Sequence, residues 1–90
     1  MAKAGAPVYA RAMPLYYFNL YNDAVTMDDE GVELADPEAA RAHAIKEARH
    51  MAADSVLQGH FACSHRIEFV DGERAPVGAV RFDEAVEVRA

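Results

Sequence analysis

The chain has 90 residues, enough for one domain near the lower size limit for unaided folding. Its composition, 52% hydrophobic and 27% charged, is that of a globular protein. The formal net charge is −6, and because Lys3 and Arg11 lie in residues 1–12, the rest of the chain carries −8, from 7 basic and 15 acidic residues. An acidic domain without a basic cluster repels phosphate, so we expect no nucleic-acid partner.

Residues 1–12 are rich in alanine, contain Gly5 and Pro7, and show no hydrophobic period. We predict that they form a flexible N-terminal extension and that residues 13–90 form a single domain. The extension has no apolar run of signal-peptide length, and no later stretch approaches the roughly 20 apolar residues of a membrane span. With Cys63 as the only cysteine, no intrachain disulfide can form. A cytoplasmic protein without membrane contact is the expectation.

The first predicted strand covers residues 15–21, directly after Pro14, and it is apolar or aromatic on both faces. Alternation places Tyr16, Phe18 and Leu20 on one face. The other face then receives Leu15, Tyr17, Asn19 and Tyr21. Turn residues at 22–23 lead to a short second strand at 25–27, and after an acidic turn at 28–31 alternation resumes at 32–34.

The clearest predicted element is a helix that begins after Asp36 and runs to Gln58. Asp36 is a good N-cap, Pro37 suits the first helical position, and Gly59 favours a left-handed termination. Successive steps of 100° sort its faces. The inner stripe is mostly alanine and should pack on the first strand, and it comprises Ala40, Ala44, Ala48, Met51, Ala52 and Ser55. The predicted outer stripe is polar and comprises His43, Glu47, His50 and Asp54.

Two further strands are predicted at residues 66–70 and 76–82, joined by a turn at Asp71-Gly72. Asp83 is expected to cap one helical turn that ends at Ala85. The predicted fold is therefore α+β: a small antiparallel sheet in ββαββ order with one long helix packed on one face. The second face of the sheet has no predicted cover, and it should expose Leu15, Tyr17 and Tyr21, with Val77 and Ala79 as further candidates. Such a face is either a partner-binding surface or an ordinary solvated sheet face.

The order of these motifs resembles a family of short bacterial proteins catalogued as a domain of unknown function. The resemblance rests on Met13-Pro14 followed by Tyr16-Tyr17-Phe18, on Asp29-Glu30-Gly31, and on the alanine-rich helix. It covers about residues 13–89. It implies that Met13 is the usual starting point, and Asn19 departs from the histidine associated with the family. The family implies no activity.

Two groups of side chains contain metal-ligand types. His43, Glu47, His50 and Asp54 share one helix stripe, which the helical pattern places in water. His60, Cys63 and His65 form a His-x-x-Cys-x-His cluster that lacks a fourth ligand, and we expect Cys63 to be a small buried thiol. No cofactor is expected, and so small a domain is expected to offer little cavity for a catalytic site.

The sequence favours a non-enzymatic protein-interaction or regulatory module. Leu15, Tyr17 and Tyr21 would bind either a protein partner or a second copy of the chain, giving a homodimer. The alternative is a metal-binding or metal-responsive protein that uses the histidine and cysteine side chains.

Overall fold

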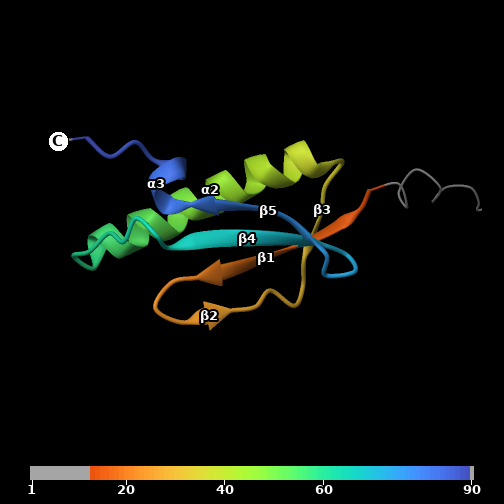
Figure 1. The fold of residues 1–90 in the computed structure, drawn as a ribbon, viewed down its shortest axis with the longest axis horizontal. Helices are drawn as coiled ribbons and strands as arrows, with labels where there is room; N and C mark the ends of the chain where they lie inside the picture. The colour runs from red at the N-terminus through yellow and green to blue at the C-terminus, as the bar shows by residue number, and fades with distance from the viewer. Residues whose placement is uncertain (1–12, 90) are drawn as a thin grey trace, which may run out of the picture.

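The computed structural model describes residues 13–89, so the predicted flexible extension, residues 1–12, lies outside the described residues, as does residue 90. Figure 1 shows a sheet with one long helix on one side of it. The elements in chain order are β1 (Leu15–Tyr21), β2 (Val25–Thr26), β3 (Val32–Glu33), α2 (Pro37–Leu57), β4 (Arg66–Asp71), β5 (Pro76–Arg81) and α3 (Phe82–Ala85). The predicted α+β class, with its antiparallel sheet and single long helix, is confirmed.

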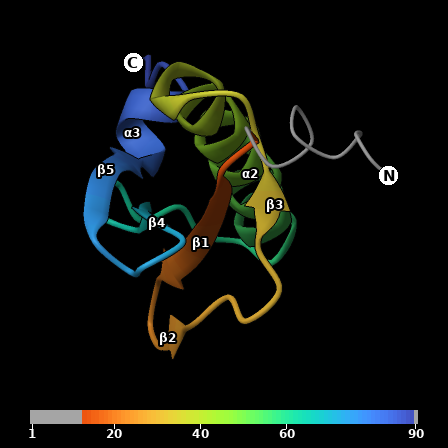
Figure 2. The same ribbon diagram turned by 90° about the vertical axis from the view of Figure 1, so that its right-hand side faces the viewer.

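The sheet has the strand order β2-β1-β4-β5, and β3 also pairs with β1. The two short strands β2 and β3 thus occupy the same edge of β1, away from β4, as Figure 2 shows. Residues 27–31 loop out between them, where the predicted acidic turn interrupts the strand. The first strand has the predicted bounds, and β1 pairs with β4 over six residues, from Tyr16 opposite Asp71 to Tyr21 opposite Arg66.

The helix begins and ends where the capping residues predict. The Asp36 carboxylate accepts a hydrogen bond of 2.8 Å from the Ala39 N–H, and Pro37 occupies the first helical position. The last turn closes at Gln58, after which Gly59 has φ +97°, a left-handed conformation that costs glycine little. The alanines at 40, 44, 48 and 52 are the buried residues of this helix.

The core lies between the helix and one face of the sheet. Its largest fully buried side chains are Ile67, Phe69, Val80 and Phe82, and Tyr16 and Phe18 from β1 join them. The helix packs mainly on β4 and β5, so β1 and β2 extend beyond it (Figure 1). The alanine stripe was expected to lie on β1; it lies instead toward the middle and the β5 edge of the sheet, because the β4–β5 hairpin supplies most of the bulky inner side chains.

Arg41, which departs from the apolar pattern of the helix, has a specific place. Its guanidinium carbon lies 5.5 Å from the centre of the Phe69 ring, and Nη1 donates to the Ala79 carbonyl at 3.4 Å. Gly78 makes this approach possible, because a Cβ there would lie 2.7 Å from Phe69 Cζ and 2.8 Å from Arg41 Nη2. A bulge between Phe69 and Val70 also changes the alternation in β5, so Val77 packs against the core and is not an outer-face residue as predicted.

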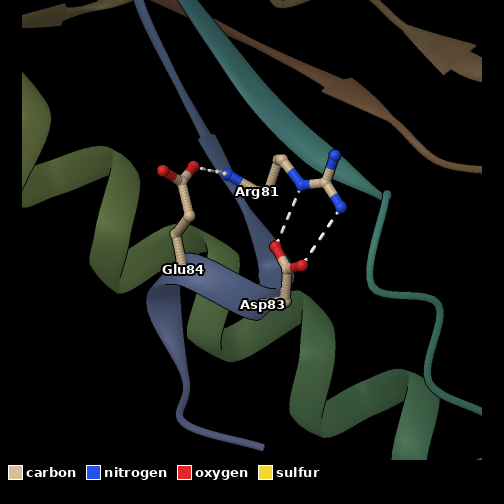
Figure 3. Close-up of polar contacts among 3 residues, drawn as sticks. All are labelled: Arg81, Asp83 and Glu84. Carbon is tan, nitrogen blue, oxygen red and sulfur yellow. Dashed lines mark hydrogen bonds and ion pairs between the residues drawn. The ribbon is translucent and has the colours of Figure 1, made fainter.

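The short helix α3 is capped differently from the prediction. Asp83 was expected to be the cap, but the helix begins at Phe82 and its N-cap is Arg81. The Glu84 carboxylate accepts a 2.8 Å hydrogen bond from the Arg81 backbone N–H, while Asp83 pairs with the Arg81 side chain (Figure 3). Only this half of a capping box, the Glu84 carboxylate on the N-cap N–H, is formed, because the arginine side chain cannot accept a hydrogen bond.

Candidate functional site

The predicted partner-binding residues lie on the sheet face opposite the helix. We call this the outer face, and by strand register it comprises Leu15, Tyr17 and Tyr21 of β1, Arg66, Glu68 and Val70 of β4, and Ala79 and Arg81 of β5. Leu15, Tyr17 and Tyr21 are each half-buried, and Ala79 is exposed. Asn19, the fourth outward position of β1, is buried. Its Oδ1 accepts a hydrogen bond from the Asp28 N–H, which belongs to residues 27–31, the looped edge of the sheet.

Arginine side chains lie over both tyrosines of the outer face. The guanidinium carbon of Arg74 lies 3.6 Å from the centre of the Tyr17 ring, and that of Arg66 lies 4.5 Å from the centre of the Tyr21 ring. Arg74 follows the β4–β5 turn with φ +68°, an uncommon conformation for a residue with a side chain. Each such cation–π contact contributes about 0.5–1 kcal/mol at an exposed site. The outer face therefore presents tyrosines capped by arginine rather than bare rings.

The other charges of the outer face are paired. Arg66 and Arg81 are opposite each other in the β4–β5 ladder, where two like charges would repel. Each is neutralised by a nearby carboxylate, Arg66 by Glu68 at 2.6 Å and Arg81 by Asp83 through two hydrogen bonds of 3.0 Å. The hydrogen bonds from Arg81 lower the pKa of Asp83, and those to Asp83 raise the pKa of Arg81.

Asp28 holds the looped edge of the sheet in place. Its Oδ2 accepts the Phe18 N–H at 3.0 Å, at a point where the edge of β1 away from β4 lies between its pairings with β2 and β3. Its Oδ1 accepts the N–H groups of Glu30 and Gly31. Its own N–H donates to Asn19 Oδ1 at 2.9 Å. Burial alone would raise the pKa of Asp28, but these three backbone hydrogen bonds and the nearby charge of Arg74 lower it below its ordinary value.

A groove of about 400 Å³ lies between this looped edge and the helix. Its lining residues are Phe18, Leu20, Thr26, Met27, Asp28, Asp29, Glu30, Gly31, Val32, His43, Glu47, Met51 and Ile67. The prediction that His43 and Glu47 face away from the core is wrong, because the helix is displaced toward β5 and turns this flank toward β1. The His43 ring centre lies 4.5 Å from that of Phe18, and its Nε2 lies 3.7 Å from the Glu47 carboxylate.

A second groove, of about 600 Å³, is almost wholly apolar and lies at the C-terminal end of the helix. Leu57 is 86% exposed beside it, and Phe61 and Val88 contribute further apolar surface. Arg49 closes one side by donating to the Ala85 carbonyl at 2.7 Å. The sequence-based expectation of little cavity is therefore wrong, since both grooves fall within the usual volume range of binding sites.

The candidate metal ligands His60, Cys63 and His65 are not brought together. Cys63 is exposed, contrary to the expected buried thiol, and His60 is also exposed. The His65 Nε2 lies 3.4 Å from the Asp23 carboxylate, and its buried Nδ1 has no hydrogen-bond partner among the residues that the structure describes. Within residues 13–89, no three histidine, cysteine or acidic side chains gather in a way that could hold a metal ion. None of the helices in the same range has the length and apolar character needed to cross a membrane.

Sequence reasoning missed both the arginine caps and the role of Asp28. The signal for the caps was weak, because Arg74 comes from a turn and its side chain crosses from one strand pair to another. The signal for Asp28 was its place in the chain between β2 and β3, which pair with the two ends of the same edge of β1. An acidic residue there lies opposite the unpaired middle of that edge. Together with Asn19 and Arg74, Asp28 forms the connection between the outer face and the looped edge.

No curated protein and no solved structure shows significant similarity to the chain. One family model does match, described as a domain of unknown function, DUF6894, and its match covers residues 15–83. That range runs from the first residue of β1 to the start of α3, so it contains all strands of the sheet and the long helix. The chain is therefore a member of the DUF6894 family.

Proposed function

We propose that the chain is a non-enzymatic protein-interaction module that pairs with a second copy of itself through the outer face. The observation that carries this proposal is the pair of arginine-capped tyrosines, Tyr17 with Arg74 and Tyr21 with Arg66, on a sheet face opposite the helix. Tyrosine and arginine are the residue types, with tryptophan, that most often dominate the energy of protein interfaces. Both aromatic rings are held by their arginines, so less side-chain freedom is lost on association.

The charges of the outer face support a symmetric pair. Glu68 lies two residues from Arg66 on β4. The Arg66 side chain is 39% exposed and the Glu68 side chain is 36% exposed. A two-fold axis that crosses β4 midway between Arg66 and Glu68 would set Arg66 of one copy against Glu68 of the other, as an isologous interface requires. Opposite charges placed in this way favour one register over others.

The size of the face supports a weak, reversible dimer. The three long strands β1, β4 and β5 have 7, 6 and 6 residues. With about 4.8 Å between strands and about 3.3 Å per residue, each face covers about 300 Å² in projection, so the two faces together contribute about 600 Å². Interfaces below about 1,200 Å² are typical of transient complexes, so we expect association in the micromolar range or weaker.

Light scattering after size exclusion, over protein concentrations from about 10 µM to about 500 µM, tests the proposal across the affinity range expected for a weak pair. We expect the mean mass to rise toward that of a dimer. Tyr17→Ser, Tyr21→Ser and Arg66→Glu should each raise the dissociation constant at least about tenfold, about 1.4 kcal/mol. Far-UV circular dichroism of each variant shows whether it is folded.

Leu57→Ser is the matched control, because Leu57 is the most exposed large apolar residue in the described part of the chain and lies outside the outer face. It should leave the dissociation constant unchanged. The double variant Arg66→Glu with Glu68→Arg restores opposite charges across the two-fold axis and should regain dimerisation. A chain that stays monomeric throughout, or a dimer lost in Leu57→Ser and kept in the tyrosine variants, rules the proposal out.

A further inference from the structure

We infer that the groove between α2 and the looped edge is a second interaction surface, which binds a short segment of a partner protein that carries lysine or arginine beside apolar side chains. This surface is separate from the outer face. It lies on the helix side of the sheet, so pairing of two outer faces would leave it open in both copies.

The groove exists because the helix does not cover the whole inner face. The helix packs mainly on β4 and β5, while β1 and the short strands β2 and β3 extend past it. Figure 2 shows β2 and β3 on the far side of β1 from β4 and β5. The inner side chains of β1 near this edge, such as Leu20, are therefore only half-buried.

The floor and walls of the groove offer apolar contact. Phe18 and Ile67 form its base, and the half-buried Leu20 and Met51 lie beside them. Met27, 57% exposed, stands on the looped edge. Methionine side chains are unbranched and polarisable, and they adapt to different apolar partners, which suits a surface that binds a peptide segment.

The rim of the groove is acidic, and this charge selects the partner. Asp28, Asp29 and Glu30 lie on the looped edge, and Glu47 lies on the helix across from them. Among residues 13–89, the lining includes no lysine or arginine, and His43 is its only basic side chain. The lowered pKa of Asp28 keeps that carboxylate charged at neutral pH. Four carboxylates around an apolar floor complement a cation with an apolar neighbour and repel acidic segments and phosphate.

The expected mode of binding follows from these two features. Apolar side chains of the segment would fill the floor near Leu20 and Met51, and its ammonium or guanidinium groups would meet Asp29, Glu30 and Glu47. Asp28 would contribute its charge only, since its oxygens already accept backbone hydrogen bonds. A volume of about 400 Å³ matches a few side chains rather than a folded domain.

The test is a titration of the isotope-labelled full chain with synthetic hexapeptides, followed by NMR. A peptide of alternating leucine and lysine should shift the amides of residues 26–32 and those of His43, Glu47 and Met51. Peptides that alternate leucine with glutamate, or serine with lysine, should bind at least about tenfold more weakly, about 1.4 kcal/mol. Added salt should weaken the binding of the leucine–lysine peptide, because the charges of the rim are near the surface.

Two variants that change the net charge by the same amount distinguish binding in the groove from attraction to the net negative charge of the chain. Glu47→Lys should weaken binding of the leucine–lysine peptide at least about tenfold. Glu73→Lys, on the exposed β4–β5 turn, should have little effect. Equal weakening by both variants would show attraction to net charge only, and the inference would fall.

Three other results would also overturn it. The first is an absence of shifts at millimolar peptide, and the second is shifts confined to the outer face or to the apolar groove beside Leu57. The third is spermidine binding as tightly as the leucine–lysine peptide, which would make the groove a small-amine site. Dimerisation through the outer face is measured without peptide, so failure of one proposal leaves the other standing.

Discussion

Replacing Asp28 with alanine removes the acceptor that closes the gap in the sheet edge. Three backbone N–H groups lose their partner, those of Phe18, Glu30 and Gly31. The Glu30 group is exposed and can turn to water, but the bonds to Phe18 and Gly31 are partly buried. A partly buried donor left without a partner costs about 1–3 kcal/mol, so the two donors together predict a loss of about 2–6 kcal/mol of unfolding free energy.

Asp28→Asn keeps one carbonyl oxygen for the loop and places an amide against the Phe18 N–H. Only the Phe18 hydrogen bond is then lost, and the expected cost is about 1–2 kcal/mol. Asp29→Ala is the control, because Asp29 is the next residue in the chain and its side chain is exposed. A surface substitution of this kind changes the free energy of unfolding by no more than about 0.5 kcal/mol. Urea unfolding of all four proteins gives these differences directly.

The pH dependence follows from the sign of the pKa shift. The pKa of Asp28 in the folded chain lies below its ordinary value of 3.8, which the unfolded chain keeps. The charged form therefore stabilises the fold above about pH 4, and this contribution is lost as the pH falls through the folded-state pKa. The stability gap between the native chain and Asp28→Asn should shrink between pH 6 and about pH 3. Equal stability of Asp28→Ala and Asp29→Ala, or a gap that does not change with pH, refutes the assigned role.

Three smaller changes test local features of the fold by the same unfolding assay. Gly78→Ala should cost about 1–3 kcal/mol, because its Cβ would lie 2.7 Å from Phe69 Cζ; an unchanged midpoint would contradict the close packing. Gly31→Ala should cost more than Gly59→Ala, since both have positive φ but only Gly31 has backbone and side-chain atoms within about 3 Å of the added Cβ; equal losses would disprove this. Asp36→Ala should cost about 1 kcal/mol and Asp36→Asn almost nothing, as expected of an N-cap.

The helix and the first strand were predictable because their signals are local. Asp36, Pro37 and Gly59 mark the two ends of α2 within a few residues, and the period of the alanines identifies its buried stripe. Strand β1 follows from the run of aromatic and apolar residues that comes directly after Pro14. The β1–β2 and β4–β5 pairings also follow, since short connections join the strands of each pair, but the β1–β4 pairing joins segments that the helix separates in the chain.

The position of α2 across the sheet could not be predicted from the helical period of its alanines alone. The alanine stripe fixes which side of α2 faces the sheet, but not which strands lie beneath it. That choice depends on where the bulky side chains Ile67, Phe69 and Val80 gather, and they belong to β4 and β5. His43 and Glu47 consequently line a groove instead of facing open water.

Contacts between distant segments were the other omission. Arg74 is 57 residues from Tyr17 in the chain, yet its side chain covers that ring and also donates to the Asp28 carbonyl at 3.0 Å. A sequence pattern shows which face a residue takes, but not where a long side chain will extend. The tyrosines of the outer face could be predicted, and their arginine caps could not.

The most direct test of the proposed pairing is an isotope-filtered NOE measurement on an equal mixture of labelled and unlabelled chains at high concentration. The proposal predicts contacts between copies from the ring of Tyr21 to the ring of Tyr17 and to the methyl groups of Val70. Contacts between copies that involve Leu57 and Val88 instead would contradict it, because they would place the interface on the apolar groove at the end of the helix.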